Sequence, residues 1–147
     1  MRTPDELTRY LHEQIPLTRA MGLATDRVSA THVSLKLPLA ANHNHKGTMF
    51  GGSLAALGTL ACWALIHVRM ERDGLAGELV VMRSEMDYTA AVTADCFGIC
   101  SFEDEDRWGR CRRGLERRGR SKLAITSELE TGGLRVAQFA GDFAIVV

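Results

Sequence analysis

The segment that most constrains the fold is SLAALGTLACWALIHV, residues 53–68, because it is apolar on every side of a helix. One face carries leucine and alanine at helical spacing and the other faces are apolar too: Leu54, Leu57, Ala61 and Leu65 on the first, and Ala55, Cys62, Trp63 and Ile66 on the others. A helix without a polar side must be surrounded by other elements. The roughly twenty residues from Gly51 to Met70 span about 30 Å at 1.5 Å per residue.

The residues before this helix predict a further helix and a strand. Thr3 can cap a helix, Pro4 suits its first position, Glu6 completes a capping box, and Pro16 ends it. Alternating apolar and polar residues over 33–39 have the period of a half-buried strand.

Everything after the central helix has the pattern of strands. Apolar or period-two segments cover residues 79–82, 96–102, 123–129 and 137–145. Residues 103–122 form a charged segment that we expect to be solvent-exposed. A buried helix followed by four or more antiparallel strands predicts an α+β fold in which the sheet curls around the helix. We expect one domain over residues 1–147.

A sheet of this size cannot cover every side of the helix and also leave no edge strand unpaired. Pairing with a second copy removes an edge, so we predict a homodimer, with a dimer of dimers left open.

Composition excludes several classes of protein. Of the 147 residues, 46% are apolar and 24% charged, which excludes a disordered chain. Eighteen basic residues balance eighteen acidic ones, so overall charge predicts neither a nucleic-acid nor a membrane partner. The four cysteines have no metal-ligand spacing and indicate reduced thiols of a cytoplasmic protein without a metal site. The charged N-terminus is not a signal peptide, and the apolar stretch from Gly51 to Ile66 is too short to predict a transmembrane span.

The transition from loop to buried helix, at Gly51 and Gly52, is where we expect chemistry. Glycines without a Cβ let a ligand approach the backbone closely. The first turn of a helix offers unpaired N–H groups and a partial positive charge, which suit an oxygen that gains negative charge. Tight packing of helix against strand is an equal alternative for the paired glycines.

This region resembles a known family. Asn44, Gly47 and Phe50-Gly51-Gly52 match the Asn-x-x-Gly-x-x-His-Gly-Gly signature of hot-dog acyl-CoA thioesterases, with Phe50 in the histidine position. LPLAANHNHKGTMFGGSLAALGTLACW, residues 37–63, more closely resembles the YiiD C-terminal type of hot-dog domain. That resemblance implies a homodimer with sites at the subunit interface, and members of the family act as malonyl-acyl-carrier-protein decarboxylases.

The resemblance implies roles for individual residues. Asn44 would hold the thioester or the substrate carboxylate, and the N–H of Gly52 would face the thioester oxygen. Thr59 stands where hot-dog thioesterases usually have Asp or Glu, seven residues after Gly52. His45, Phe50 and Gly51 are candidate substrate-binding residues. The chain departs from the pattern at Ala91, where a proline often follows the aromatic residue Tyr88, so no site residue is assigned from that strand.

Thr59 separates two chemistries. Hydrolysis needs a carboxylate that activates water or attacks the carbonyl, and no Asp or Glu occurs from Phe50 to Met70. Decarboxylation of a malonyl thioester needs only an oxyanion site and a poorly solvated, well-oriented carboxylate. A threonine hydroxyl can bond to that carboxylate, although it can also bond back to the Ala55 carbonyl.

We therefore expect a decarboxylase acting on a malonyl thioester of acyl carrier protein or coenzyme A. It would feed fatty-acid synthesis and need no cofactor beyond the phosphopantetheine or coenzyme A of the substrate. An acyl thioesterase and a non-catalytic binding module are the alternatives.

Three further features leave their alternatives open. Cys62 lies near the face of Thr59, but core packing is the favoured interpretation. His43 and Lys46 are more easily explained as exposed loop residues than as a base and a phosphate ligand. The basic residues of segment 107–122 follow the acidic run 103–106, and the two could neutralise one another as a solvated hairpin or short helix. Docking of an acidic carrier protein, or of nucleic acid, are the other interpretations of that run.

Overall fold

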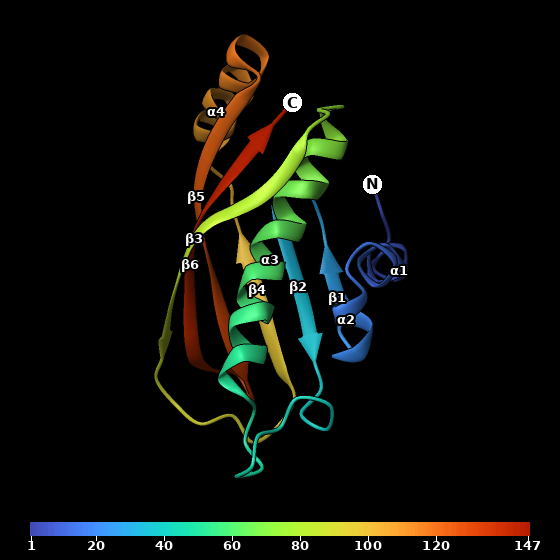
Figure 1. Cartoon of the computed structure of the whole chain (residues 1–147), viewed down its shortest axis with the longest axis vertical. Helices are drawn as coiled ribbons and strands as arrows, with labels where there is room; N and C mark the ends of the chain where they lie inside the picture. The colour runs from blue at the N-terminus through green and yellow to red at the C-terminus, as the bar shows by residue number, and fades with distance from the viewer.

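A computed structural model describes all 147 residues as a curved antiparallel sheet that holds one long helix in its concave face (Figure 1). The central helix α3 spans Gly51–Arg72. The six strands lie in the order β1-β2-β4-β5-β6-β3. Their bounds are β1 Ala24–Val28, β2 His32–Leu37, β3 Glu78–Tyr88, β4 Cys96–Ser101, β5 Arg120–Thr131 and β6 Leu134–Val146. The predicted α+β architecture is confirmed.

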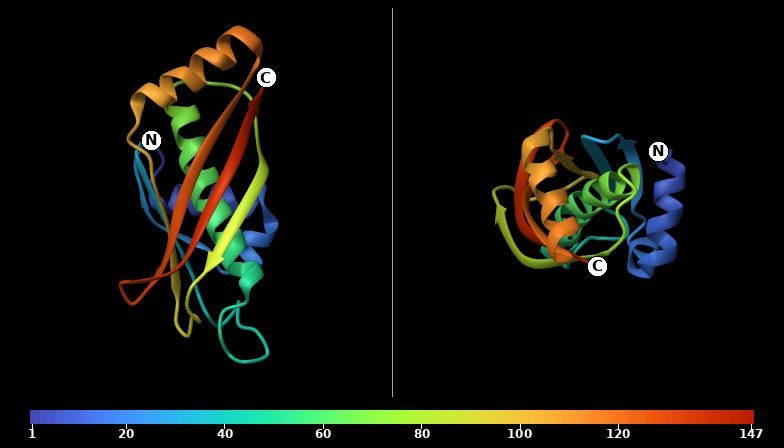
Figure 2. Two further views of the ribbon diagram at one scale, coloured as in Figure 1. Left: turned by 90° about the vertical axis from the view of Figure 1, so that its left-hand side faces the viewer. Right: turned by 90° about the horizontal axis from the view of Figure 1, so that it is seen from above.

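The N-terminal helices cover the side of the molecule away from the curve of β5, β6 and β3 (Figure 2). The capping box of α1, Pro4–Gln14, forms as predicted, since Thr3 and Glu6 each accept a hydrogen bond from the other's backbone N–H. Helix α2, Pro16–Ala20, and strand β1 were not predicted from the sequence. Thr8 of α1 accepts a hydrogen bond of 2.8 Å from the backbone N–H of Thr25, which ties α1 to β1.

Helix α3 is the centre of the hydrophobic core. Twelve of its residues are buried, and the cluster around it includes buried residues from β2, β4, β5 and β6. Its length and composition would also suit a membrane span, but the core helix of a globular domain shares these properties. Two glycines let helix and sheet approach closely: a Cβ at Gly58 would lie 2.6 Å from the Phe139 Cβ, and one at Gly98 would lie 2.7 Å from the Leu57 Cγ.

Replacing Gly58 by alanine is expected to lower the free energy of unfolding by about 1–3 kcal/mol, because the methyl group overpacks a rigid part of Phe139. Gly109→Ala is the matched control within a helix, since there the nearest atom is the flexible end of Arg113, 3.2 Å away. The control should be neutral or gain about 0.5–1 kcal/mol. Denaturant titration of both variants measures the difference, and equal stabilities would contradict the packing argument.

The two edges of the sheet differ. Edge strand β1 is five residues long, carries Asp26 and Arg27, and lies beside α1. Edge strand β3 has eleven residues, pairs only with β6, and leaves Val80, Val81 and Met82 between 45% and 55% exposed. A long, apolar, unpaired edge invites pairing with another strand, whereas a short charged one resists it.

The charged segment 103–122 is more ordered and more buried than predicted. It forms helix α4, Glu105–Arg118, whose Trp108, Cys111, Gly114 and Leu115 are buried. Trp108 donates its Nε1–H to Asp73 Oδ2 at 2.6 Å, and Arg69, only 1% exposed, donates to the Phe102 carbonyl at 2.8 Å and pairs with Glu105. These contacts fix α4 over the C-terminal end of α3. The sequence left a short helix open but did not predict this burial, because charged residues outnumber the few apolar ones that anchor the helix.

Candidate active site

The loop between β2 and α3 is shaped by two asparagines. Asn42, 4% exposed, donates its side-chain amide to the carbonyls of Met21 at 2.9 Å and Pro38 at 2.8 Å. Its own carbonyl accepts the backbone N–H of Phe50 at 2.7 Å. These bonds hold the residue before α3 in an extended conformation (φ −59°, ψ 132°), from which the helix begins.

Asn44 organises the tip of the same loop. Its Oδ1 accepts backbone N–H groups from Lys46 at 2.8 Å and Thr48 at 3.2 Å. Its Nδ2 donates to the Thr48 hydroxyl at 2.8 Å. The amide oxygen is therefore occupied within the loop, and one amide N–H is left for a substrate oxygen.

The first turn of α3 presents two free backbone donors. The N–H groups of Ser53 and Leu54 both reach the Phe50 carbonyl, at 3.0 and 3.2 Å. Those of Gly51 and Gly52 have no acceptor in the chain, and no side chain caps the helix. Unpaired N–H groups at a helix N-terminus, reinforced by the helix dipole, form an anion-binding site.

Two exposed aromatic rings flank these donors. Phe50 is 57% exposed and lies over Gly52, so close that a Cβ on Gly52 would be 2.3 Å from the ring. Tyr88, at the end of β3, is 52% exposed and donates its hydroxyl to the Gly51 carbonyl at 3.1 Å. The sequence alone predicted no site residue in β3. Tyr88, an aromatic residue at the end of a strand, was the feature that could have indicated a site residue. Ala91, in place of the expected proline, weakened the match to the family there.

Thr59 lies on the same helix, two turns and about 10 Å beyond Gly52. It is partly exposed, and its hydroxyl donates to the Ala55 carbonyl at 2.8 Å. This is the back-bond that the sequence left open as an alternative. The hydroxyl oxygen still has lone pairs that can accept, but donation to a ligand would require the O–H bond to turn away from the Ala55 carbonyl.

No carboxylate of this chain points toward these groups from α3 or from the end of β3. The first acidic residue of α3 is Glu71, at the opposite end, where it is paired with Arg2. Strand β3 places Met86 and Tyr88 on the helix side, so alternation turns Asp87 to the outer face.

The remaining candidates lie at the rim or in the core. His43, His45 and Lys46 are exposed on the loop, with the His43 ring contacting the Asn44 carbonyl at 3.1 Å. Cys62 is fully buried, and burial raises the pKa of its thiol well above the usual range. Cys62 is therefore a core residue.

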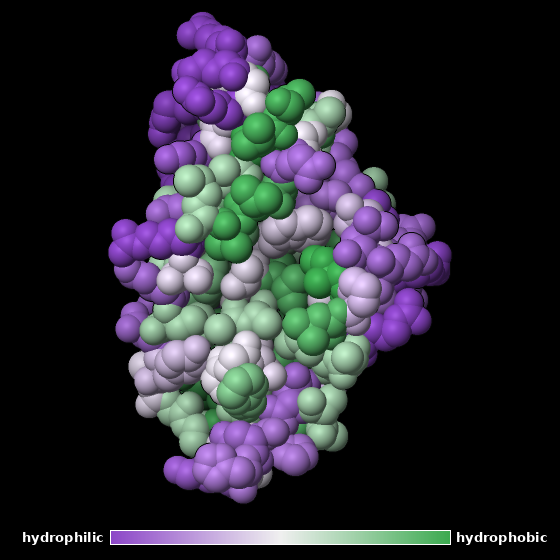
Figure 3. Space-filling model, viewed as in Figure 1, coloured by the Kyte–Doolittle hydropathy of each residue, from purple (hydrophilic) through white to green (hydrophobic).

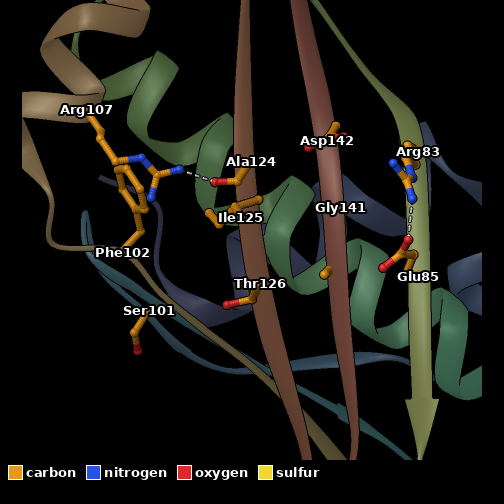
Figure 4. A pocket seen from close by; sticks show the side chains of 11 residues that line it. Arg83, Glu85, Ser101, Phe102, Arg107, Ala124, Ile125, Thr126, Gly141 and Asp142 are labelled. Carbon is orange, nitrogen blue, oxygen red and sulfur yellow. Dashed lines mark hydrogen bonds and ion pairs between the residues drawn. The ribbon is translucent and has the colours of Figure 1, made fainter.

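A separate hollow of about 480 Å³ lies on the outer face of the sheet (Figure 4). Arg83 pairs with Glu85 on one side, and Arg107 donates to the Ala124 carbonyl on the other. None of its lining residues comes from α3 or from the loop before it. This hollow is therefore unrelated to the free donors of Gly51 and Gly52.

The structure thus brings Phe50, Gly51 and Gly52 together with Tyr88 in one small site. Asn44 lies on the adjoining loop, Thr59 two turns along the helix, and His45 at the exposed rim.

Comparisons with known proteins agree with this architecture. A family described as "putative thioesterase (yiiD_Cterm)" matches residues 4–147. No curated protein matches the sequence. A protein of unknown function from Chlorobaculum tepidum is 27% identical, with a TM-score of 0.90 over 98% of this chain and 96% of its own. A structure from Shewanella oneidensis described as a "putative thioesterase" is 26% identical, with a TM-score of 0.86 over 98% and 97% of the two chains.

A third similar structure, from Pseudomonas aeruginosa and described as a "probable thioesterase", is 24% identical, with a TM-score of 0.84 over 99% of this chain and 97% of its own. The fold is the hot-dog fold, and the function is one connected with acyl thioesters. The chain belongs to the YiiD C-terminal family of hot-dog domains.

Proposed function

We propose that this protein decarboxylates a malonyl thioester, carried by acyl carrier protein or coenzyme A, to the acetyl thioester. In this reaction the bond between the α-carbon and the carboxylate breaks and CO₂ leaves. The electron pair moves into the thioester carbonyl as an enolate, which is then protonated from water at the α-carbon. The thioester bond remains intact throughout.

The observation that carries the proposal is the pair of free N–H groups at Gly51 and Gly52, to which α3 and the end of β3 of the same chain bring no carboxylate. An enolate oxygen within hydrogen-bond distance of the Gly52 N–H would be stabilised by that donor and by the dipole of α3. A carboxylate on α3 would repel the malonyl carboxylate, and the chain has none from Phe50 to Met70.

Two polar side chains are suited to orient the substrate. The free amide N–H of Asn44 would hold one oxygen of the malonyl thioester. The Thr59 hydroxyl, after rotation away from Ala55, would hold the departing carboxylate out of the thioester plane. The rings of Phe50 and Tyr88, which lie at Gly52 and Gly51, would cover the thioester end of the substrate.

A homodimer that pairs through β3 is part of the proposal. Tyr88, the residue that ends this exposed edge, contacts Gly51, so a second copy paired there would lie beside the site. No metal or organic cofactor is required beyond the arm of the substrate itself.

Mixing the protein with malonyl-acyl carrier protein and with malonyl-CoA, and following acyl mass and free thiol separately, tests the reaction. We expect CO₂ loss with the thioester retained. Asn44→Ala and Thr59→Val should each lower kcat about 10²-fold, the loss typical of one transition-state hydrogen bond. Thr126→Val, which removes an exposed hydroxyl on the outer face, is the matched control and should leave kcat unchanged.

Hydrolysis is the second candidate, favoured by the family description. It would require a water held by Asn44 and Thr59 in place of a carboxylate. Release of free thiol without CO₂ would establish this reaction and refute the decarboxylase. Binding of thioesters with no turnover of either kind would refute both.

A further inference from the structure

The outer face of α4 carries a concentrated positive charge. Its buried residues turn toward β5, and on a helical wheel Arg110, Arg113 and Arg117 lie directly opposite Trp108. Arg118, Arg120 and Lys122 continue the charge into β5. All six side chains belong to exposed residues, and none forms an ion pair within the chain. We call these six residues the α4 basic face; the end of the molecule that α4 occupies, at the upper left of Figure 3, is strongly hydrophilic.

The acidic residues beside this face are mostly engaged elsewhere. Glu105 pairs with Arg69 and Arg72, and Asp104 caps α4 by accepting the Arg107 N–H at 2.8 Å. Glu116 lies 3.7 Å from Arg112. Asp106 and Glu103 are exposed without an ion pair, so two acids remain against six cations. Of the interpretations that the sequence left open, mutual pairing of the acidic run with these arginines is not observed, because the contacts of Asp104 and Glu105 go to the helix cap and to α3.

A cleft between α4 and β5 adds to this charge. It has a volume of about 210 Å³ and is lined by Arg107, Arg110, Lys122 and the Ser121 hydroxyl, with no carboxylate among its lining residues. Three cations and a hydroxyl around one cleft suit an anionic side chain of a partner.

The face is held rigidly. Asp73 accepts the indole N–H of Trp108. Its hydrogen bond to Arg72 and, to a smaller extent, that to Trp108 lower the pKa of the Asp73 carboxyl to about 2. The Arg69 guanidinium lies 4.9 Å from the centre of the Trp108 ring. A preformed surface loses little side-chain and loop freedom when a partner binds.

We propose that the α4 basic face docks the acidic carrier protein that bears the thioester, an inference that rests on the proposed function. Charge complementarity supports this partner, since carrier proteins present an acidic surface and the face presents six unpaired cations. Nucleic acid fits less well. The only aromatic residue of α4, Trp108, is 2% exposed and unavailable for stacking on bases, and the net charge of the chain is zero.

The position of α4 determines which site a docked carrier serves. Helix α4 lies at the C-terminal end of α3, and the 22 residues of α3 separate it from Gly51 by about 33 Å (Figure 1). A phosphopantetheine arm is shorter than that distance. In a two-fold dimer joined through β3, the protomers run antiparallel, so the α4 end of one protomer lies at the Gly51 end of the other. A carrier docked on one protomer therefore serves the site of its partner.

Charge reversal of the face tests the docking. Arg110→Glu/Arg113→Glu/Arg117→Glu is compared with Arg9→Glu/Arg19→Glu/Arg27→Glu, which makes the same change in net charge at exposed arginines of α1, α2 and β1. The first triple variant should raise KM for malonyl-acyl carrier protein at least about tenfold and leave KM for malonyl-CoA and both kcat values unchanged, since like charges at an interface repel. The control should resemble the wild type with both substrates.

Calorimetry with carrier protein that lacks its phosphopantetheine arm separates docking from the reaction. Loss of binding in the first variant only, with wild-type binding weakened by salt, supports the docking face even if the wild type turns over neither substrate. Equal binding of carrier to wild type and variant would overturn it. Binding of a DNA duplex, lost in the same variant while carrier binding persists, would assign the face to nucleic acid instead.

Mixed dimers test the cross-subunit arrangement. One subunit carries the triple charge reversal, and the other carries Gly52→Ala with an intact α4. Recovery of turnover of malonyl-acyl carrier protein in the mixed dimer supports delivery between subunits, because the only intact site is then served by the only intact face. Turnover no higher than that of the charge-reversed homodimer would overturn this arrangement.

Discussion

Replacing Gly52 by alanine is expected to lower kcat for the malonyl thioester roughly 100-fold without lowering the melting temperature. A methyl group at this position would lie 2.3 Å from the Phe50 ring, so the ring must swing away from the donors that it flanks. Displacement of a substrate-positioning group by about 1 Å can cost about 10²-fold in rate. The backbone at Gly52 has an ordinary helical φ, so alanine adds no strain and helix propensity offers about 0.5–1 kcal/mol in return.

Gly51→Ala is the matched control, one residue away on the same turn. There the added methyl group would meet the Tyr88 ring at 3.7 Å, an ordinary contact. Stability should change as in Gly52→Ala, while kcat should stay within a fewfold of the wild type. Thermal denaturation and steady-state turnover of both variants give the comparison. Equal losses of kcat in the two variants, or a fall in melting temperature in Gly52→Ala alone, would contradict this account of the Phe50 ring.

Introducing charge on the exposed edge, as Val81→Lys/Met82→Lys, is expected to convert a dimer into a folded monomer and to remove turnover. Both side chains are about half exposed in the single chain, so the substitutions should change the stability of the monomer little. Lysine on an edge strand opposes pairing with a second strand. Sedimentation velocity at micromolar concentration measures the oligomeric state.

Leu17→Lys provides the comparison, because Leu17 is an apolar residue of α2 that is 63% exposed and lies away from β3. That variant should remain dimeric and active. A wild-type protein that is monomeric at the same concentration would refute the dimer. A monomeric edge variant with full turnover would show instead that the site is complete within one chain.

The central helix and the later strands were predictable because each has a strong pattern of its own. Residues 53–68 are apolar on all sides, and β5 and β6 alternate regularly. Strand β1 was missed because its five residues include Asp26 and Arg27, which give no apolar alternation. The exposure of residues 80–82 could not be predicted either, since a continuous apolar run is also what a buried strand contains.

The backbone donors of the candidate site could be predicted from the sequence, whereas the contacts of its side chains could not. Paired glycines at a helix start indicated free N–H groups, and the chain leaves both unpaired. The sequence could not reveal that the amide oxygen of Asn44 accepts hydrogen bonds from the backbone N–H groups of Lys46 and Thr48, because those bonds depend on the conformation of the loop. The contact of Tyr88 with Gly51 joins residues 37 positions apart and follows only from the way β3 crosses the helix.

The uncapped first turn of α3 also has a meaning for folding. Serine or aspartate in place of Phe50 would satisfy a first-turn N–H and stabilise the helix by about 1 kcal/mol. The chain has a phenylalanine there and keeps those donors free. Under the proposed function, the developing negative charge of the substrate would take the place of the missing cap, so substrate binding would also stabilise the first turn of α3.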